Sequence, residues 1–144
     1  MNFQALFKGI LVLTWLVGAV FAGFPGDARA QSDAPTVIVL NARASVAPAL
    51  QLYLERGLQL AVDQKAEAVV IALNTPGGSL DSMNLIVEKI RACSVPVVVY
   101  VSPRGAWAAS AGTIITLAGH VAAMAPETTI GAASPVGGEG QDIG

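Results

Sequence analysis

Two short motifs carry residue types suited to acyl-transfer chemistry. In the first, Ser110 stands in a run of very small residues, Ala108–Gly112. In the second, Gly77 and Gly78 follow a strand-like apolar run. A serine hydroxyl is a weak nucleophile, so it needs a base and donors for the oxyanion, and glycine lets another backbone approach closely. The pair therefore predicts a nucleophile and an oxyanion cradle, the alternatives being a packing serine and an ordinary strand-to-helix turn.

The elements around these motifs are expected to alternate between strands and helices. Apolar runs predict strands over 36–40, 68–73, 97–101 and 120–125, and helices are expected over 47–64, from Ser79 to about 92, and over 107–117. The expected buried stripes of the first two helices are Leu50, Leu54, Leu58, Ala61 and Val62, and Leu80, Met83, Ile86, Val87 and Ile90. Such alternation implies parallel pairing, so both motifs follow the carboxyl ends of strands, where open α/β sheets place their sites.

The same two motifs resemble elements of the Clp protease and crotonase superfamily. Asn74–Gly78 resembles its Asn-Ser-Pro-Gly-Gly element, and Trp107–Gly112 resembles its serine element. Four segments look like the NfeD-type membrane-bound serine proteases, partners of stomatin-like proteins: Thr75–Gly78, Val97–Tyr100, Ala109–Thr113 and Ala123–Pro126. The resemblance covers roughly residues 37–135. It implies an α/β fold of repeated β-β-α units with a mainly parallel sheet, here truncated at the C-terminus.

The resemblance also implies roles for particular residues. Ser110 matches the nucleophile, and Gly77, Gly78 and Ala111 match the oxyanion-hole region, with the amides of Gly78 and Ala111 as the expected donors. The general base of the family is a lysine that lies further along than residue 144, so no residue of this chain inherits that role. No cofactor or metal is implied. The expected partners are polypeptides with apolar stretches and a stomatin-like membrane protein, and homo-oligomers and later membrane-spanning segments are expected.

Three residues of the chain are rivals for the role of the base. His120 follows Ser110 by ten residues, across a predicted helix that would hold the two apart. We therefore interpret His120 as structural. Lys65 and Lys89 lie on the polar parts of helices and are interpreted as solvated charges. Half of a Ser-Lys dyad is the expectation, and the chain by itself is expected to be inactive.

Composition and the N-terminus bound the remaining possibilities. The 144 residues, with a net charge of −2, are enough for one domain. Lys8, the apolar run 9–24 and Ala28–Ala30 predict a signal peptide over 1–30, cleaved after Ala30, with an uncleaved anchor as the alternative. The protease domain, 31–144, would then lie outside the cytoplasm, associated with the membrane. No basic patch indicates nucleic acid, and the single Cys93 is interpreted as buried and inert.

Three classes of function follow from these observations. The first is an extracytoplasmic, membrane-associated serine endopeptidase that cleaves apolar peptide segments by a Ser-Lys mechanism. The second is a crotonase-type acyl-CoA enzyme, which the signal peptide opposes because CoA substrates are intracellular. The third is a protease-like module that binds peptides or scaffolds a membrane complex without catalysis. A signal-peptide peptidase relative would differ mainly in the position of its lysine.

Overall fold

The computed structural model describes residues 35–134, and the predicted signal peptide lies outside them. Its centre is a four-stranded parallel sheet in the order β1-β2-β3-β5. The strands are β1 (Val37–Ala42), β2 (Ala68–Leu73), β3 (Val97–Val101) and β5 (Val121–Met124). In the register of the sheet, Val70 pairs with Val39 on one side and with Val98 on the other. The four predicted strands and their parallel pairing are confirmed.

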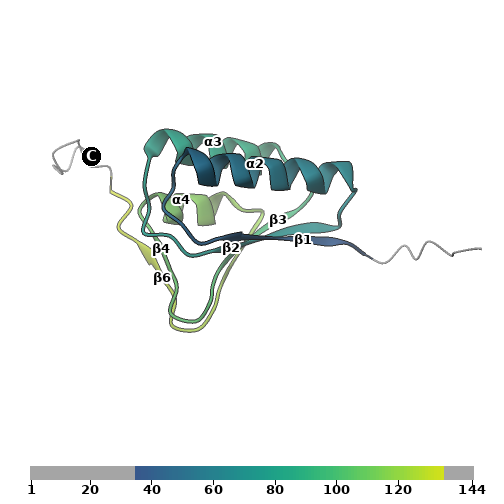
Figure 1. Ribbon diagram of the computed structural model, residues 1–144. Helices are drawn as coiled ribbons and strands as arrows, with labels where there is room; N and C mark the ends of the chain where they lie inside the picture. Colours follow the sequence, from purple (N-terminus) through teal and green to yellow (C-terminus); the bar gives the residue numbers. More distant parts are fainter. Residues whose placement is uncertain (1–34, 135–144) are drawn as a thin grey trace, which may run out of the picture. The chain divides into compact units, whose positions relative to one another are not determined.

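Three helices cover one face of this sheet (Figure 1). They are α2 (Pro48–Asp63), α3 (Leu80–Ala92) and α4 (Ala111–Ala118). The buried residues of α2 and α3 are Leu50, Leu54, Gly57, Leu58, Ala61, Ser82, Met83, Ile86 and Ile90. Ser79 caps α3 by accepting a hydrogen bond from the amide of Ser82 at 3.3 Å, as predicted. The predicted stripes are therefore confirmed in their central positions.

Two predicted stripe positions are wrong. Leu80 is 66% exposed, because it is the first residue of α3 and no described element covers it. Val62 is 36% exposed near the end of α2. Gly57 takes a place in the buried stripe instead, because a β-carbon there would lie only 2.4 Å from the Leu40 side chain. Glycine thus lets α2 pack closely on β1.

A second, two-stranded sheet lies apart from the first and consists of β4 (Trp107–Ala109) and β6 (Thr129–Gly131), paired in parallel (Figure 1). The predicted helix over 107–117 is therefore wrong in its first residues, and α4 begins only at Ala111. The small residues here favour a helix locally. Pairing with β6, and an isolated bridge between Ala108 and Thr75, override that preference.

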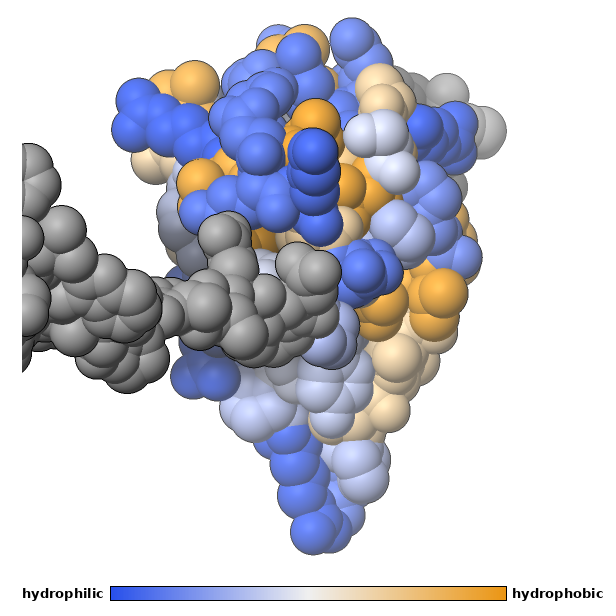
Figure 2. Space-filling view, turned by 90° about the vertical axis from the view of Figure 1, so that its right-hand side faces the viewer, coloured by the Kyte–Doolittle hydropathy of each residue, from blue (hydrophilic) through white to orange (hydrophobic). Residues whose placement is uncertain are grey.

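The face of the large sheet that points away from the helices is apolar at its edges. Val37, Val39 and Val121 are about half exposed there, at 49%, 56% and 54%. Figure 2 shows hydrophobic residues gathered part-way down the right-hand side of that view, with hydrophilic residues above and below them. No helix within residues 35–134 is long and apolar enough to cross a membrane. The core lies between the large sheet and the helices.

Candidate active site

Ser110 occupies a strained turn between β4 and α4. Its backbone angles are φ 51° and ψ −118°, a conformation that a residue with a β-carbon rarely adopts. The side chain caps no helix amide in this turn and is partly exposed. Strain of this kind costs about 1–3 kcal/mol and clusters at functional sites. A serine on a sharp strand-to-helix turn has its hydroxyl presented outward, as in nucleophile elbows.

The hydrogen bonds of this turn decide which amides are available. The Ser110 amide donates to the carbonyl of Gly131 at 2.7 Å, so it is already used. The Thr113 amide donates to the carbonyl of Ser110 at 2.9 Å. Within residues 35–134 the amide of Ala111 has no partner, as is usual in the first turn of a helix. The Ala111 amide, at the positive end of α4, is therefore free to donate a hydrogen bond to an anionic oxygen.

Gly77 brings the second motif against the serine turn. Its φ is 103°, and a β-carbon there would lie 2.8 Å from the Ser110 β-carbon and 3.0 Å from the Ala109 carbonyl oxygen. Only glycine permits this approach. The Gly77 amide donates to the Thr75 hydroxyl at 3.2 Å, and Thr75 is fully buried. The structure thus places the two motifs in contact, with the amide of Gly77 already paired.

Gly78 is held from one side only. The Val46 amide donates to the Gly77 carbonyl, and the Ser79 amide donates to the Val46 carbonyl, both at 2.8 Å. In such a parallel bridge the middle residue, Gly78, directs its own N–H and C=O away from Val46. Gly78 is exposed, and its amide has no partner among the described residues. This amide can therefore donate to a ligand beside Ser110.

The residues considered as rival bases lie at the other end of the large sheet. His120 precedes β5, and its Nδ1 accepts a hydrogen bond from the Val97 amide at 3.1 Å. Lys65 follows the end of α2. Lys89 forms an ion pair with Glu55 at 3.0 Å, and the hydrogen bond that its ammonium group donates to the Glu55 carboxylate raises the pKa of Lys89. A base needs a lysine that loses its proton easily, so the pairing of Lys89 works against that role.

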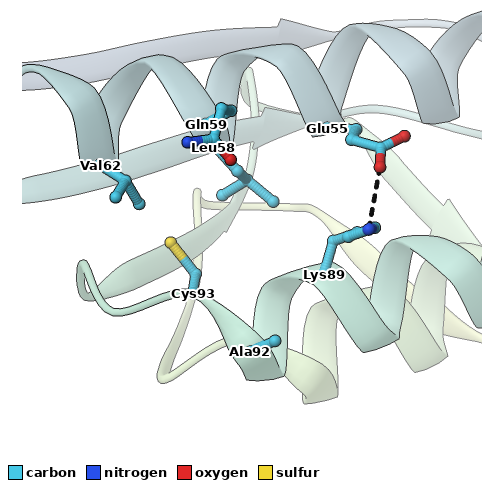
Figure 3. Close-up of a pocket in the computed structure, with 7 residues that line it drawn as sticks. All are labelled: Glu55, Leu58, Gln59, Val62, Lys89, Ala92 and Cys93. Carbon is cyan, nitrogen blue, oxygen red and sulfur yellow. Dashed lines mark ion pairs between the residues drawn. The ribbon is translucent and has the colours of Figure 1, made fainter.

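The pocket found in the described residues lies away from Ser110. It has a volume of about 240 Å³ and opens between α2 and the C-terminal half of α3. Its lining consists of Glu55, Leu58, Gln59, Val62, Lys89, Ala92 and Cys93 (Figure 3). Cys93 is partly buried, packs against the core and borders this pocket, so the prediction that it is buried is only partly met. Cys93 is the residue that follows the last turn of α3, and its side chain faces the pocket between the two helices.

Some residues of the site were missed at the level of sequence. Thr75 and Thr113 are buried, and their hydroxyls bind backbone groups of the glycine loop and the serine turn. Val46 holds Gly78 across a bridge from a distant part of the chain. Both threonines belong to segments that carry the resemblance, Thr75–Gly78 and Ala109–Thr113, but the sequence indicated no role for their hydroxyls, and it gave no signal for Val46. No cluster of three potential metal ligands occurs within the described range.

Comparison with known proteins places the chain in a family. The model of the NfeD1b N-terminal domain matches residues 36–144. The chain belongs to the NfeD1b family. It is 34% identical over 139 residues to the membrane protein NfeD1b of Bacillus subtilis, covering 96% of this chain and 29% of that protein. It is 49% identical over 88 residues to the membrane-bound protease PH1510 of Pyrococcus horikoshii, covering 61% and 20%. The chain thus spans less than a third of either relative.

Solved structures agree with this membership. A serine-to-alanine variant of the 1510-N membrane-bound stomatin-specific protease matches with a TM-score of 0.69 and 41% identity, over 71% of this chain and 49% of that one. A lysine-to-alanine variant in complex with a substrate peptide matches with a TM-score of 0.71 and 38% identity, over 76% and 52%. ClpP1 from Listeria monocytogenes shares the fold at 23% identity and a TM-score of 0.61, over 69% and 58%. The predicted NfeD-type resemblance and Clp/crotonase-like fold of this NfeD1b domain are confirmed.

Proposed function

We propose that this NfeD1b domain is the N-terminal part of a membrane-associated serine endopeptidase. The observation that carries the proposal is the turn at Ser110, with its φ of 51° and with Gly77 packed against it. A serine beside two open amides supplies the nucleophile and the oxyanion donors that acyl transfer uses, and the base is proposed to come from beyond residue 144. The relatives that are named proteases support the same class of reaction.

In the proposed mechanism, the Ser110 hydroxyl attacks a peptide carbonyl. A lysine beyond residue 144 takes the hydroxyl proton and later gives it to the leaving amine, and water then releases the acyl group. The amides of Gly78 and Ala111 hold the oxyanion that forms in each half of the reaction. Burial would lower the pKa of that lysine, so that it is neutral and able to act as a base. No cofactor enters these steps.

The substrate is proposed to be a polypeptide with an apolar stretch, bound in extended form. The free N–H and C=O of Gly78 offer one edge to such a strand. Trp107, on β4 two residues from Ala109, is 62% exposed and offers an apolar surface near the serine turn. A relative is named as stomatin-specific, so a stomatin-like membrane protein is the proposed partner. We further propose that the domain lies outside the cytoplasm and works as a homo-oligomer.

Kinetics of the full-length protein test this proposal. With an apolar peptide as substrate, we expect Ser110→Ala to lower kcat by at least about a thousandfold, as the loss of a nucleophile does elsewhere. Ser94→Ala is the control, because Ser94 is an exposed serine just before β3, at the far end of the sheet. Peptide cleavage by Ser110→Ala at the wild-type rate would refute the assignment. Cleavage by a purified 31–144 fragment would refute the proposed position of the base.

A further inference from the structure

Thr113 lies in the first turn of α4, and its hydroxyl contacts backbone groups that lie outside this helix. Its side chain is 7% exposed. The oxygen lies 2.8 Å from the carbonyl of Ala108 and 2.8 Å from the carbonyl of Gly131. It also accepts a hydrogen bond from the Gly131 amide at 2.8 Å. Because a hydroxyl has one proton, the two carbonyls share it while the amide binds the oxygen.

These contacts join the parts of the chain that meet at the serine. Ala108 belongs to β4, and Gly131 ends β6. The Gly131 carbonyl is the same group that accepts the Ser110 amide at 2.7 Å. The Thr113 hydroxyl therefore helps to hold the N–H and the C=O of Gly131. The Gly131 carbonyl in turn holds the backbone amide of Ser110. Gly131 itself has a φ of 143°. Glycine is free to adopt many other backbone conformations, so contacts with other residues must hold it in this one.

We propose that Thr113 is a positioning residue for the nucleophile. Its hydroxyl holds the Gly131 carbonyl where that carbonyl keeps the Ser110 turn at its positive φ, an inference that rests on the proposed function of Ser110. Without the hydroxyl, the amide and the carbonyl of Gly131 each lose one polar partner, and the carbonyl is held only by the pairing of β6 with β4 and the Ser110 turn, so that it can shift more easily. Displacement of a reacting group by about 1 Å can cost about a hundredfold in rate. The Gly78 edge is held separately by Val46, so substrate binding should be unaffected.

The test compares two buried threonines of the same helix in the full-length protein. Thr116 is 1% exposed, and its hydroxyl donates only to the Gly112 carbonyl, at 2.7 Å within α4. Thr113→Val and Thr116→Val remove the same atom at almost the same burial. We expect Thr113→Val to lower kcat about ten- to a hundredfold with KM within about twofold. Thr116→Val should stay within about threefold of wild type, and Thr113→Ser should restore kcat.

Two results would overturn the proposal. One is a folded Thr113→Val protein with wild-type kcat, and the other is an equal loss in Thr116→Val. If Thr113→Val does not fold, Gly131→Ala takes its place, since a β-carbon at Gly131 meets no atom within 4 Å and strains only the backbone. That variant should show the same loss of kcat at unchanged KM, and a wild-type kcat would refute the proposal.

A measurement that needs no activity separates this inference from the proposed function. In the full chain, hydrogen exchange of the Ser110 amide should become at least about tenfold faster in Thr113→Val than in Thr116→Val. An unchanged exchange rate refutes the role of Thr113, whatever the reaction is. Wild-type activity in Ser110→Ala, by contrast, refutes the role of Ser110 and leaves the exchange result to stand by itself.

Discussion

The serine edge and the groove between α2 and α3 differ in what marks them. The groove contains a pocket of about 240 Å³, and its charged groups are an exposed ion pair, Lys89 and Glu55. The serine edge is marked by backbone geometry instead, with positive φ at Ser110, Gly77 and Gly78 and two amides left open. The pocket and the proposed reacting groups therefore lie in different parts of the domain. Our proposal places the reaction at the strained and closely packed serine edge.

The largest effect on stability is expected at Gly78. A β-carbon at this position would lie 2.2 Å from the Val46 carbonyl oxygen and 2.8 Å from the Val46 nitrogen, and both atoms belong to the backbone. Gly78→Ala should therefore lower the free energy of unfolding by about 3 kcal/mol or more. Gly105→Ala is the control, because Gly105 also has a positive φ, 75°, but meets nothing within 4 Å. It should cost about 1 kcal/mol.

Urea unfolding of both variants measures the difference. Equal losses for Gly78→Ala and Gly105→Ala would show that the serine edge is no more tightly packed than an exposed loop. Close packing would then not distinguish the serine edge from the rest of the domain.

A smaller effect of opposite sign is expected at Ser110. Glycine adopts a φ of 51° without strain, whereas alanine does not. Replacing alanine by glycine here relieves about 1–3 kcal/mol of backbone strain, but it also gives the unfolded chain more conformational freedom, which opposes folding. We therefore expect Ser110→Gly to be more stable than Ser110→Ala by about 1 kcal/mol. Both variants should be inactive. Thermal unfolding measures the difference, and equal stabilities would mean that the turn stores no strain.

The smallest effect is expected in the groove, at Lys89. Glu55 raises the pKa of Lys89, so the pair stabilises the fold at neutral pH and loses that contribution only as the pH rises through the raised pKa. Exposed pairs of this kind contribute little. Lys89→Gln should leave kcat/KM within about twofold and leave both limbs of the pH–rate profile in place. A shifted limb would make the groove part of the catalytic machinery.

The sheet, the helices and the two motifs are predictable from the sequence because each depends on local signals. Continuous apolar runs such as Ala68–Leu73 indicate buried strands, and three- and four-residue spacing indicates the helix faces. The strand at Trp107–Ala109 was not predictable in this way. Its partners, Thr75 and β6, lie far away in the sequence, and its small residues favour a helix when taken alone.

The site was predictable in its residue types but not in its geometry. Spacing and the family resemblance predict a site at Ser110, Gly77, Gly78 and Ala111. The structure brings the segments that carry these residues together. The resemblance favours the amide of Gly78 as a donor, but the sequence does not give the physical reason, which is that the amide of Gly77 pairs with the Thr75 hydroxyl whereas that of Gly78 is open. That distinction depends on long-range pairing, which only the folded chain establishes. The catalytic roles themselves stay predictions.

Covalent labelling of the full-length protein tests the central claim most directly. A fluorophosphonate reacts with a serine that is activated as a nucleophile: the hydroxyl oxygen bonds to phosphorus, fluoride leaves, and the base takes the hydroxyl proton. We expect a single adduct, mapped by tandem mass spectrometry to Ser110, and no adduct in Ser110→Ala. An adduct on another residue, or labelling of Ser110→Ala equal to that of the wild type, would contradict the assignment of Ser110 as the nucleophile.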